Sequence, residues 1–445
     1  MRRTQMTRPN SVSTLYAYDS LSHLTSVLHQ LSGSTIDGAA YTLDNAGNRT
    51  AKTDELAGVT SNYSYDAIYE LTGVTQGSNT TESYTYDPVG NRLSSLGVSS
   101  YTTNSSNELT STSNGTYTYD NDGNLLTKVV GSNTTSYAWD FENRLTSVTL
   151  PGSGGTVSFK YDPFGRRIYK SSSSATSVYA YDGDNLIEET NSAGTVVARY
   201  TQGLNIDEPL AMLRSSTTSY YQADGLGSLT SLSNTSGALA NTYTYDSFGN
   251  LTASTGSLTN SFQYTGREFD SETGLYYYRA RYYDPSAGRF LTEDPLRYEP
   301  TSFYSYVGND PIFWMDPLGL YKCAPKASCD FIPELDAALK RFENCYNKPL
   351  TVTCGADSHP PADPHMWGNA VDIGGNSNPG LTRAIAEDCF KKSFPQKYPN
   401  GTGWGSYAQQ EYNSGNAGGW HFHFQYFPGR GGASGFSPGI HPHGH

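Results

Sequence analysis

The chain has 445 residues, of which 16% are charged and 13% aromatic, and its formal net charge is −13. So few charges exclude a coiled coil, a helical bundle and a basic nucleic-acid-binding protein, while the aromatic content excludes a disordered chain. The sequence has no run of about 18 apolar residues to span a membrane, and Met1–Thr7 is not followed by the apolar core of a signal peptide.

A repeat of roughly 20 residues fills the first part of the chain. Its fullest copies begin at Tyr84, Tyr117 and Tyr243, and each reads Tyr-Thr-Tyr-Asp followed by Gly-Asn. Alternating Tyr and Thr predicts a strand, and Asp-x-x-Gly-Asn predicts a turn that tolerates positive φ. A second strand follows. The aspartate-type positions are therefore predicted to be turn residues rather than catalytic groups: Asp19, Asp44, Asp66, Asp87, Asn104, Asp120, Asp140, Asp162, Asp182, Gln202, Asp224 and Asp246.

One such hairpin cannot bury its own apolar face, but twelve stacked copies can. The pattern predicts a mainly β structure of antiparallel hairpins, either a continuous solenoid or a rolled sheet.

Three further motifs follow the repeats. Residues 274–295 read Gly-Leu-Tyr-Tyr-Tyr-Arg-Ala-Arg-Tyr-Tyr-Asp-Pro-Ser-Ala-Gly-Arg-Phe-Leu-Thr-Glu-Asp-Pro, residues 304–311 read Tyr-Ser-Tyr-Val-Gly-Asn-Asp-Pro, and residues 316–320 read Asp-Pro-Leu-Gly-Leu. The repeat resembles the YD repeat of Rhs and Tc-toxin C proteins, and these motifs resemble the end of the Rhs core. The resemblance implies a partial or short β-shell over residues 1–265. It also implies a segment, residues 266–320, that plugs the shell and cuts the chain, and a C-terminal toxin.

Self-cleavage needs one carboxyl group to give a proton and another to activate water. The resemblance places these roles on Asp294 and Asp316 and places the cut between Leu320 and Tyr321. The first aspartate motif departs from the family, because it reads Asp294-Pro-Leu-Arg297 where Asp-Pro-x-Gly is usual.

The composition changes after Leu320. The last 125 residues hold all five cysteines and seven of the nine histidines, with 10 Lys+Arg against 10 Asp+Glu. The pattern predicts a small α+β domain over residues 321–428, with helices at 335–346 and 379–389 and strands at 350–354 and 420–426. A Gly/Pro/His tail, residues 429–445, is predicted to be disordered. The cysteines suggest an oxidising compartment, and two disulfides could form in fifteen ways.

Two histidine motifs in this domain predict a metal site. His365 is followed by Gly368, Ala370 and Asp372, and His421-Phe-His423 lies on a predicted strand that places both imidazoles on one face. Two histidines and one aspartate suit a catalytic zinc with an open fourth position.

These motifs resemble the LAS metallopeptidases, named for lysostaphin, D-alanyl-D-alanine peptidase and Hedgehog. The resemblance implies that His365, Asp372 and His423 bind Zn²⁺ and that His421 is the general base. Whether His421 or His423 is the third ligand stays open, because a second alignment places Gly418 where part of the family has a glutamate base.

The leading hypothesis is an Rhs-type toxin, secreted or delivered into competitors, whose zinc peptidase domain cuts peptidoglycan peptides in the target periplasm or wall. It implies a cognate immunity protein, a secretion machinery and no nucleic-acid partner. One alternative is a metal-dependent nuclease domain, against which the neutrality of residues 321–445 counts. The other is a structural shell with an inert, Hedgehog-like tail.

Overall fold

The computed structural model describes residues 3–295, 302–320, 370–374, 403–409 and 421–427. The chain divides into two compact units, Arg2–Pro325 and Lys326–His445. In the second unit only the backbone of three strands is described. The predicted helices at 335–346 and 379–389, the strand at 350–354, the five cysteines and the tail lie outside the described residues.

The first unit is mainly β, as the repeat predicts. Every strand of its first two sheets pairs antiparallel with the next strand in the chain, so the sheets are rolled ribbons of successive hairpins. The nine-stranded sheet consists of β1 (Gln5–Thr7), β2 (Val12–Tyr18), β3 (Leu24–Leu31), β4 (Ser34–Leu43), β5 (Arg49–Asp54), β6 (Val59–Tyr65), β7 (Leu71–Gln76), β8 (Asn79–Tyr86) and β9 (Arg92–Ser95).

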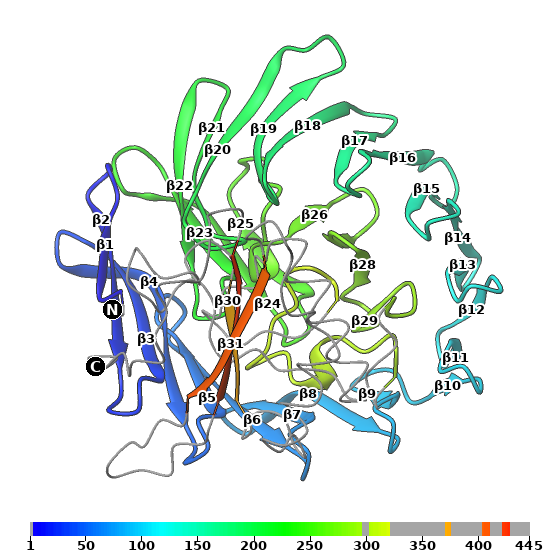
Figure 1. The fold of residues 1–445 in the computed structure, drawn as a ribbon, viewed down its shortest axis with the longest axis horizontal. Coiled ribbons are helices and arrows are strands. Elements are labelled where there is room, and N and C mark those ends of the chain that lie inside the picture. Colours follow the sequence, from blue (N-terminus) through cyan, green and yellow to red (C-terminus); the bar gives the residue numbers. More distant parts are fainter. Residues whose placement is uncertain (1–2, 296–301, 321–369, 375–402, 410–420, 428–445) are drawn as a thin grey trace. The chain divides into compact units, whose positions relative to one another are not determined.

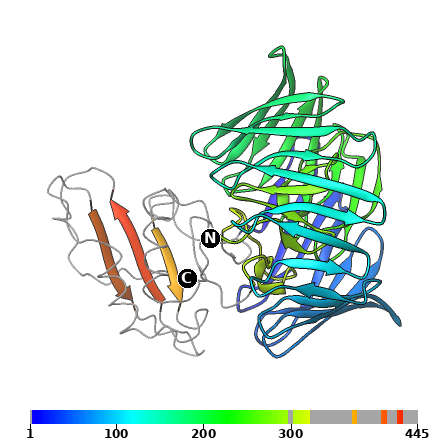
Figure 2. The ribbon, with the colours of Figure 1, turned by 90° about the vertical axis from the view of Figure 1, so that its right-hand side faces the viewer.

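The second sheet has sixteen strands and forms the long curved wall in Figures 1 and 2. It consists of β10 (Tyr101–Thr103), β11 (Leu109–Thr112), β12 (Gly115–Tyr119), β13 (Leu125–Val130), β14 (Asn133–Trp139), β15 (Leu145–Thr149), β16 (Thr156–Tyr161), β17 (Arg167–Ser171), β18 (Thr176–Asp182), β19 (Asn185–Asn191), β20 (Val196–Gln202), β21 (Pro209–Arg214), β22 (Thr217–Ala223), β23 (Leu229–Ser233), β24 (Leu239–Tyr245) and β25 (Leu251–Thr255).

The repeated aspartates close the turns. At Asp120, Oδ1 accepts hydrogen bonds from the amides of Asp122 and Asn124, both at 2.9 Å, and Oδ2 accepts one from the Asn124 side chain. Gly123 adopts φ 79°, a conformation that favours glycine. This pattern confirms the predicted turn role for Asp120 and for each repeated aspartate whose carboxylate accepts hydrogen bonds in the same way.

These turns all join an even-numbered strand to the next odd-numbered one. Because the pairing is antiparallel and consecutive, they lie at one end of the strands in each sheet, and the other turns lie at the opposite end. We call this end the Asp-turn rim.

Residues 262–295 and 302–320, which we call the inner segment, lie on the concave side of the wall (Figure 1). They form the short 3-10 helices η1 (Tyr264–Gly266) and η2 (Val307–Asn309), and a separate four-stranded sheet. Five of its tyrosines pack into a buried aromatic cluster with Phe290. The strands of the sheet are β26 (Glu268–Asp270), β27 (Leu275–Tyr278), β28 (Arg281–Asp284) and β29 (Arg289–Phe290).

The inner segment is held by backbone carbonyls of the Asp-turn rim. In five turns, the carbonyl of the residue with positive φ accepts a hydrogen bond from an inner-segment side chain. The pairs, carbonyl first, are Gly90 with Asn309, Asn107 with Arg289, Gly123 with Tyr304, Gly165 with Tyr277, and Gly249 with Tyr276.

Buried ion pairs add to this attachment. Arg167 on β17 binds Glu268 at 2.9 Å and also binds Asp270, and all three side chains are almost fully buried. Lys128 on β13 binds Asp284 at 2.7 Å. The wall and the inner segment therefore form one continuous structure.

The second unit contains a three-stranded antiparallel sheet in the order β30 (Ala370–Gly374), β32 (His421–Phe427), β31 (Gly403–Gln409). Strand β32 lies where the alternation at 420–426 predicts a strand, whereas β30 and β31 were not predicted. Among the described residues of the chain, no helix is long and apolar enough to cross a membrane.

Candidate functional site

The two predicted aspartates of the inner segment converge on one arginine. Nη2 of Arg281 lies 3.3 Å from Oδ2 of Asp294 and 3.2 Å from Oδ2 of Asp316. All three residues are buried, with exposed fractions of 4%, 5% and 3% respectively. A single cation between two buried carboxylates offsets the repulsion that would otherwise separate them.

Arg281 is itself fixed from three directions. Strand β28 carries it, its Nη1 donates to the carbonyl oxygen of Phe303 at 3.2 Å, and its guanidinium lies 3.7 Å from the ring centroid of Phe290. The amide of Asp294 donates to the same Phe303 carbonyl at 2.9 Å. The arginine and the first aspartate therefore share one backbone anchor.

The end of the inner segment lies against this cluster. The amide of Leu320 donates to Oδ1 of Asp316 at 2.9 Å, and Nε of Arg281 donates to the carbonyl oxygen of Gly319 at 2.5 Å. Arg279 holds the carbonyl of Pro317, also at 2.5 Å. Arg281 thus contacts Gly319 and Asp316 contacts Leu320, the two residues that precede the predicted cut.

Gly319 occupies a position that other residues cannot. Its φ is 69°, and a Cβ atom built there would lie 2.5 Å from the carbonyl oxygen of Tyr278 and 3.1 Å from the amide nitrogen of Arg281. The first contact is shorter than atoms tolerate and the second is tight, so glycine is required for the chain to pass this close to β27 and β28.

Buried aromatic side chains pack beside the cluster. Phe290, Tyr278 and Tyr306 are almost completely buried, and the hydroxyl groups of Tyr278 and Tyr306 hydrogen-bond each other at 3.1 Å. Burial raises the pKa of Tyr306, and the charge of Asp316 adds to this shift. The tyrosines are therefore neutral hydrogen-bonding groups beside the carboxylates.

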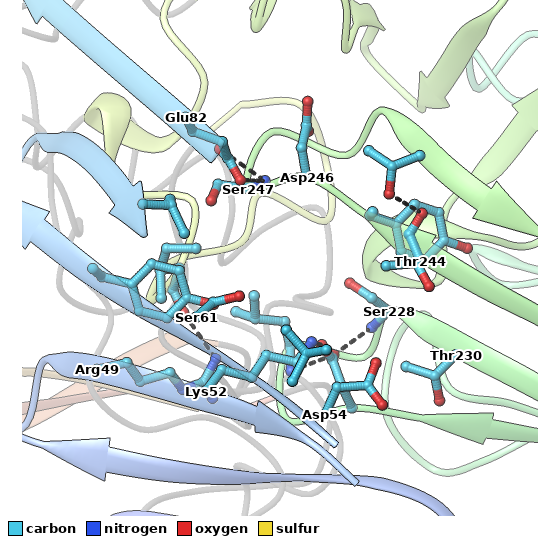
Figure 3. Close-up of a pocket in the computed structure, with 18 of the residues that line it drawn as sticks. Arg49, Lys52, Asp54, Ser61, Glu82, Ser228, Thr230, Thr244, Asp246 and Ser247 are labelled. Carbon is cyan, nitrogen blue, oxygen red and sulfur yellow. Dashed lines mark hydrogen bonds and ion pairs between the residues drawn. The ribbon is translucent and has the colours of Figure 1, made fainter. Parts of the chain in front are cut away.

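A cavity of about 300 Å³ lies between the nine-stranded sheet and the last strands of the sixteen-stranded sheet (Figure 3). Lys52 binds Asp224 across it at 2.7 Å, and Glu82 accepts hydrogen bonds from the amide of Ser247 at 3.1 and 3.2 Å. Burial raises the pKa of Glu82, to which the charge of Asp246 contributes. These groups join the two sheets, and we assign them a structural role.

The predicted metal residues are described only in part. In the second unit Asp372 pairs directly with His423 in the register of β30 and β32, and Gly374 pairs with His421. Asp372, His421 and His423 therefore occupy positions on one face of the sheet. His365 lies outside the described residues. Within those residues no group of three or more potential ligands gathers, so the Zn²⁺ site stays a prediction.

The resemblance pointed to Asp294, Asp316 and Leu320, whose roles stay predictions, and it did not point to Arg281. The only signal for it was its place in the motif Tyr-Tyr-Arg-Ala-Arg281-Tyr-Tyr-Asp, where charge within an aromatic run predicts a buried ion pair. Tyr321 lies outside the described residues.

A family model described as the teneurin YD-shell matches residues 54–312. The tRNA3(Ser)-specific nuclease WapA of Bacillus spizizenii is 34% identical over 276 residues, which are 57% of this chain and 12% of that protein. The tRNA nuclease WapA of Bacillus subtilis strain 168 is 33% identical over 276 residues, with the same two shares. The chain therefore spans only about an eighth of the length of these relatives.

Two further comparisons concern a shorter match and the fold. The probable deoxyribonuclease RhsA of Dickeya dadantii is 48% identical over 61 residues, 14% of this chain and 4% of that protein. The crystal structure of TcdB2-TccC3-Cdc42 has a TM-score of 0.60 and 21% identity, covering 72% of this chain and 19% of that chain. The second match shows that the fold is that of a Tc-toxin shell.

The prediction of a zinc metallopeptidase is wrong. The three relatives described above are named as tRNA nucleases or as a deoxyribonuclease, and this also counts against peptidoglycan as substrate and against the exclusion of nucleic acid. The physical reason is that a pair of short histidine motifs describes only a donor set. Imidazole and carboxylate groups can serve the hydrolysis of phosphodiesters as well as peptides.

Proposed function

The chain belongs to the teneurin YD-shell family, and on that premise we propose that it is an Rhs-type toxin that cuts itself between Leu320 and Tyr321 to free its C-terminal domain. The observation that carries this proposal is the contact of Asp294 and Asp316 with one nitrogen of Arg281, beside Gly319 and Leu320. A buried pair of carboxylates next to a fixed peptide is the arrangement that acid–base hydrolysis requires.

The proposed reaction hydrolyses one peptide bond. One carboxylate takes a proton from a water molecule, and the oxygen of that water molecule attacks the carbonyl carbon of Leu320. The other carboxyl group gives a proton to the nitrogen of Tyr321 as the carbon–nitrogen bond breaks. Arg281 positions both groups and, through the Gly319 carbonyl, the peptide. The turn that Asp316 and Leu320 form keeps the substrate in place before the reaction starts.

Mass spectrometry of the purified chain tests this proposal. The wild type should yield fragments 1–320 and 321–445, whereas Asp294→Asn and Asp316→Asn should each stay intact. Asp122→Asn, a substitution in an exposed turn of the shell, is the matched control and should cleave. An intact wild-type chain, or normal cleavage in both active-site variants, would contradict the proposal.

We further propose that the freed domain is a metal-dependent nuclease. The names of the relatives support this activity, and the register that brings Asp372 beside His423 supports a metal site. Asp372, His423 and His365 would hold the ion, and His421 would act as base on the same face. A bound divalent ion would supply positive charge at the phosphate and lower the pKa of water. Residues 321–445 are formally neutral and offer no net positive charge to a phosphate group, so the charge of the ion is the more necessary.

Digestion of tRNA and plasmid DNA by the purified, self-cleaved protein tests the nuclease proposal. Cleavage should require Zn²⁺ or another divalent ion, stop with chelator, and be lost in His423→Ala but not in the tail variant His441→Ala. Intact tRNA and DNA with every ion would contradict it without bearing on self-cleavage. A toxin of this kind would need a delivery machinery and a cognate immunity protein, and a nuclease would act inside the recipient cell.

A further inference from the structure

The Asp-turn rim exposes two phenylalanine side chains in neighbouring hairpins. Phe141, in the turn between β14 and β15, is 93% exposed, and Phe164, in the turn between β16 and β17, is 85% exposed. The four strands are consecutive in one sheet (Figure 1), so the two turns lie roughly 10 Å apart. The rim therefore presents two exposed rings on adjacent Asp-turns, close enough for one partner segment to cover both.

A third phenylalanine of the Asp-turn rim, Phe248, is covered by other parts of the protein. Phe248 is the third residue of its turn, as Phe164 is of its own, yet it is only 1% exposed. It packs against Ile312 of the inner segment, against Tyr84 at 5.0 Å between ring centroids, and under the guanidinium of Arg92 at 4.3 Å. An aromatic side chain at this turn position therefore serves as an anchor where a protein segment covers the rim.

The surroundings of Phe141 and Phe164 are acidic. The four turns 120–124, 140–144, 162–166 and 182–185 carry seven carboxylates and two arginines. Both arginines are already paired: Arg144 binds Asp140 and Glu142, and Arg166 binds Asp162. The net negative charge disfavours a second copy of the same rim and an anionic lipid surface, because either would bring like charges together.

We propose that this part of the Asp-turn rim is a docking surface for a basic protein segment that covers Phe141 and Phe164 with apolar side chains. The contact would be of the kind that the inner segment makes at Phe248, and the acidic charge of these turns complements a partner rich in lysine or arginine. It is independent of the self-cleavage and nuclease proposals, since none of its residues belongs to either site.

Three fluorescent amphipathic peptides test the docking surface by anisotropy: one of leucine and lysine, one of leucine and glutamate, and one of serine and lysine. Only the leucine–lysine peptide should bind the full-length protein well, and added salt should weaken its binding. The double variant Phe141→Ser/Phe164→Ser should lose about tenfold or more in affinity, as for aromatic anchors. The matched control is Leu56→Ser/Leu96→Ser, which alters exposed apolar residues on the opposite rim and should bind as the wild type does.

Other outcomes would overturn the proposal. Equal binding of the leucine–glutamate peptide, or unchanged affinity in the phenylalanine variant, would show that the rim does not select a basic apolar partner. Self-association of the wild type that the variant loses, measured by light scattering, would make a second copy the occupant. Binding of the wild type, but not the variant, to phosphatidylcholine/phosphatidylserine vesicles would make the occupant a membrane.

Discussion

The carboxylates of Asp294 and Asp316 stand 22 residues apart in the sequence, yet both lie within 3.3 Å of the same nitrogen atom of Arg281. Neither aspartate could be held this way without the arginine, because two buried carboxylates repel each other. The cluster therefore depends on three residues, and self-cleavage should be as sensitive to the arginine as to the aspartates.

Arg281→Gln should slow self-cleavage about tenfold or more, and Arg281→Lys should fall between it and the wild type, because lysine keeps the charge but loses the planar fork. The rate can be followed by cell-free synthesis and gel analysis of the 1–320 fragment. Arg199→Gln removes an exposed arginine paired with Glu188 and serves as control. Cleavage of Arg281→Gln at the wild-type rate would remove the arginine from the mechanism.

Gly319→Ala should abolish cleavage while the shell remains folded, because the added methyl group would meet the Tyr278 carbonyl at 2.5 Å. Gly274→Ala separates this clash from backbone strain. Gly274 has a similar φ of 73°, but a Cβ atom there would meet nothing within 4 Å. The control variant should therefore cleave normally at a small loss of melting temperature. If both variants cleave equally well, the close approach of Gly319 does not matter.

Glu70→Gln should make the shell more stable at pH 8 and change it little at pH 5. Burial raises the pKa of Glu70 to about 7. The protonated carboxyl group therefore contributes its full stabilisation of the fold below the ordinary pKa of glutamate, and this stabilisation is lost as the pH rises through 7. Glutamine keeps the acceptor that the Asn309 side chain binds at 2.8 Å. The gain at pH 8 should be about 1 kcal/mol once solvent screening is considered.

Urea unfolding at pH 5 and pH 8 measures this difference, with the exposed Glu55→Gln as control. A gain of equal size at both values would mean that the charge of Glu70 is not its cause.

Arg167→Met should destabilise the shell by about 3–5 kcal/mol, because it leaves Glu268 and Asp270 buried beside an apolar side chain. The triple variant Arg167→Met/Glu268→Gln/Asp270→Asn removes those charges as well and should recover a large part of the loss. Thermal unfolding measures both variants, and Arg199→Met is the exposed control. A loss below about 1 kcal/mol, the range of exposed ion pairs, would show that the triad is not effectively buried.

The hairpins could be predicted because each is specified locally. Alternation forms the strands, and one aspartate with a glycine three residues later forms the turn, as at Asp120 and Gly123. The convergence of Asp294 and Asp316 could be expected only from the resemblance. The role of Arg281 could not be predicted, because it depends on how the inner segment folds back on itself. The pairing of Arg167 with Glu268 could not be predicted either, because it joins the wall to the inner segment across a long stretch of sequence.

The chemistry of the second unit was the least predictable part. The motifs around His365 and His423 identify atoms able to bind a metal, but the identity of the bond that is cut depends on how the surrounding surface receives a substrate. A histidine and an aspartate at opposite positions, such as His423 and Asp372, are compatible with more than one hydrolytic reaction.

The attachment of the inner segment to turn carbonyls has a consequence for how this architecture can vary. A main-chain oxygen is present whatever residue occupies the turn, as Asn107 shows by accepting from Arg289 where other turns use glycine. Most residues of these turns could therefore change without loss of the hydrogen bonds to the inner segment. The donors Asn309, Tyr304, Tyr277 and Tyr276 must be kept. The segment should accordingly be transferable between walls of quite different sequence, provided that the spacing of their turns is the same and that cations equivalent to Arg167 and Lys128 are kept.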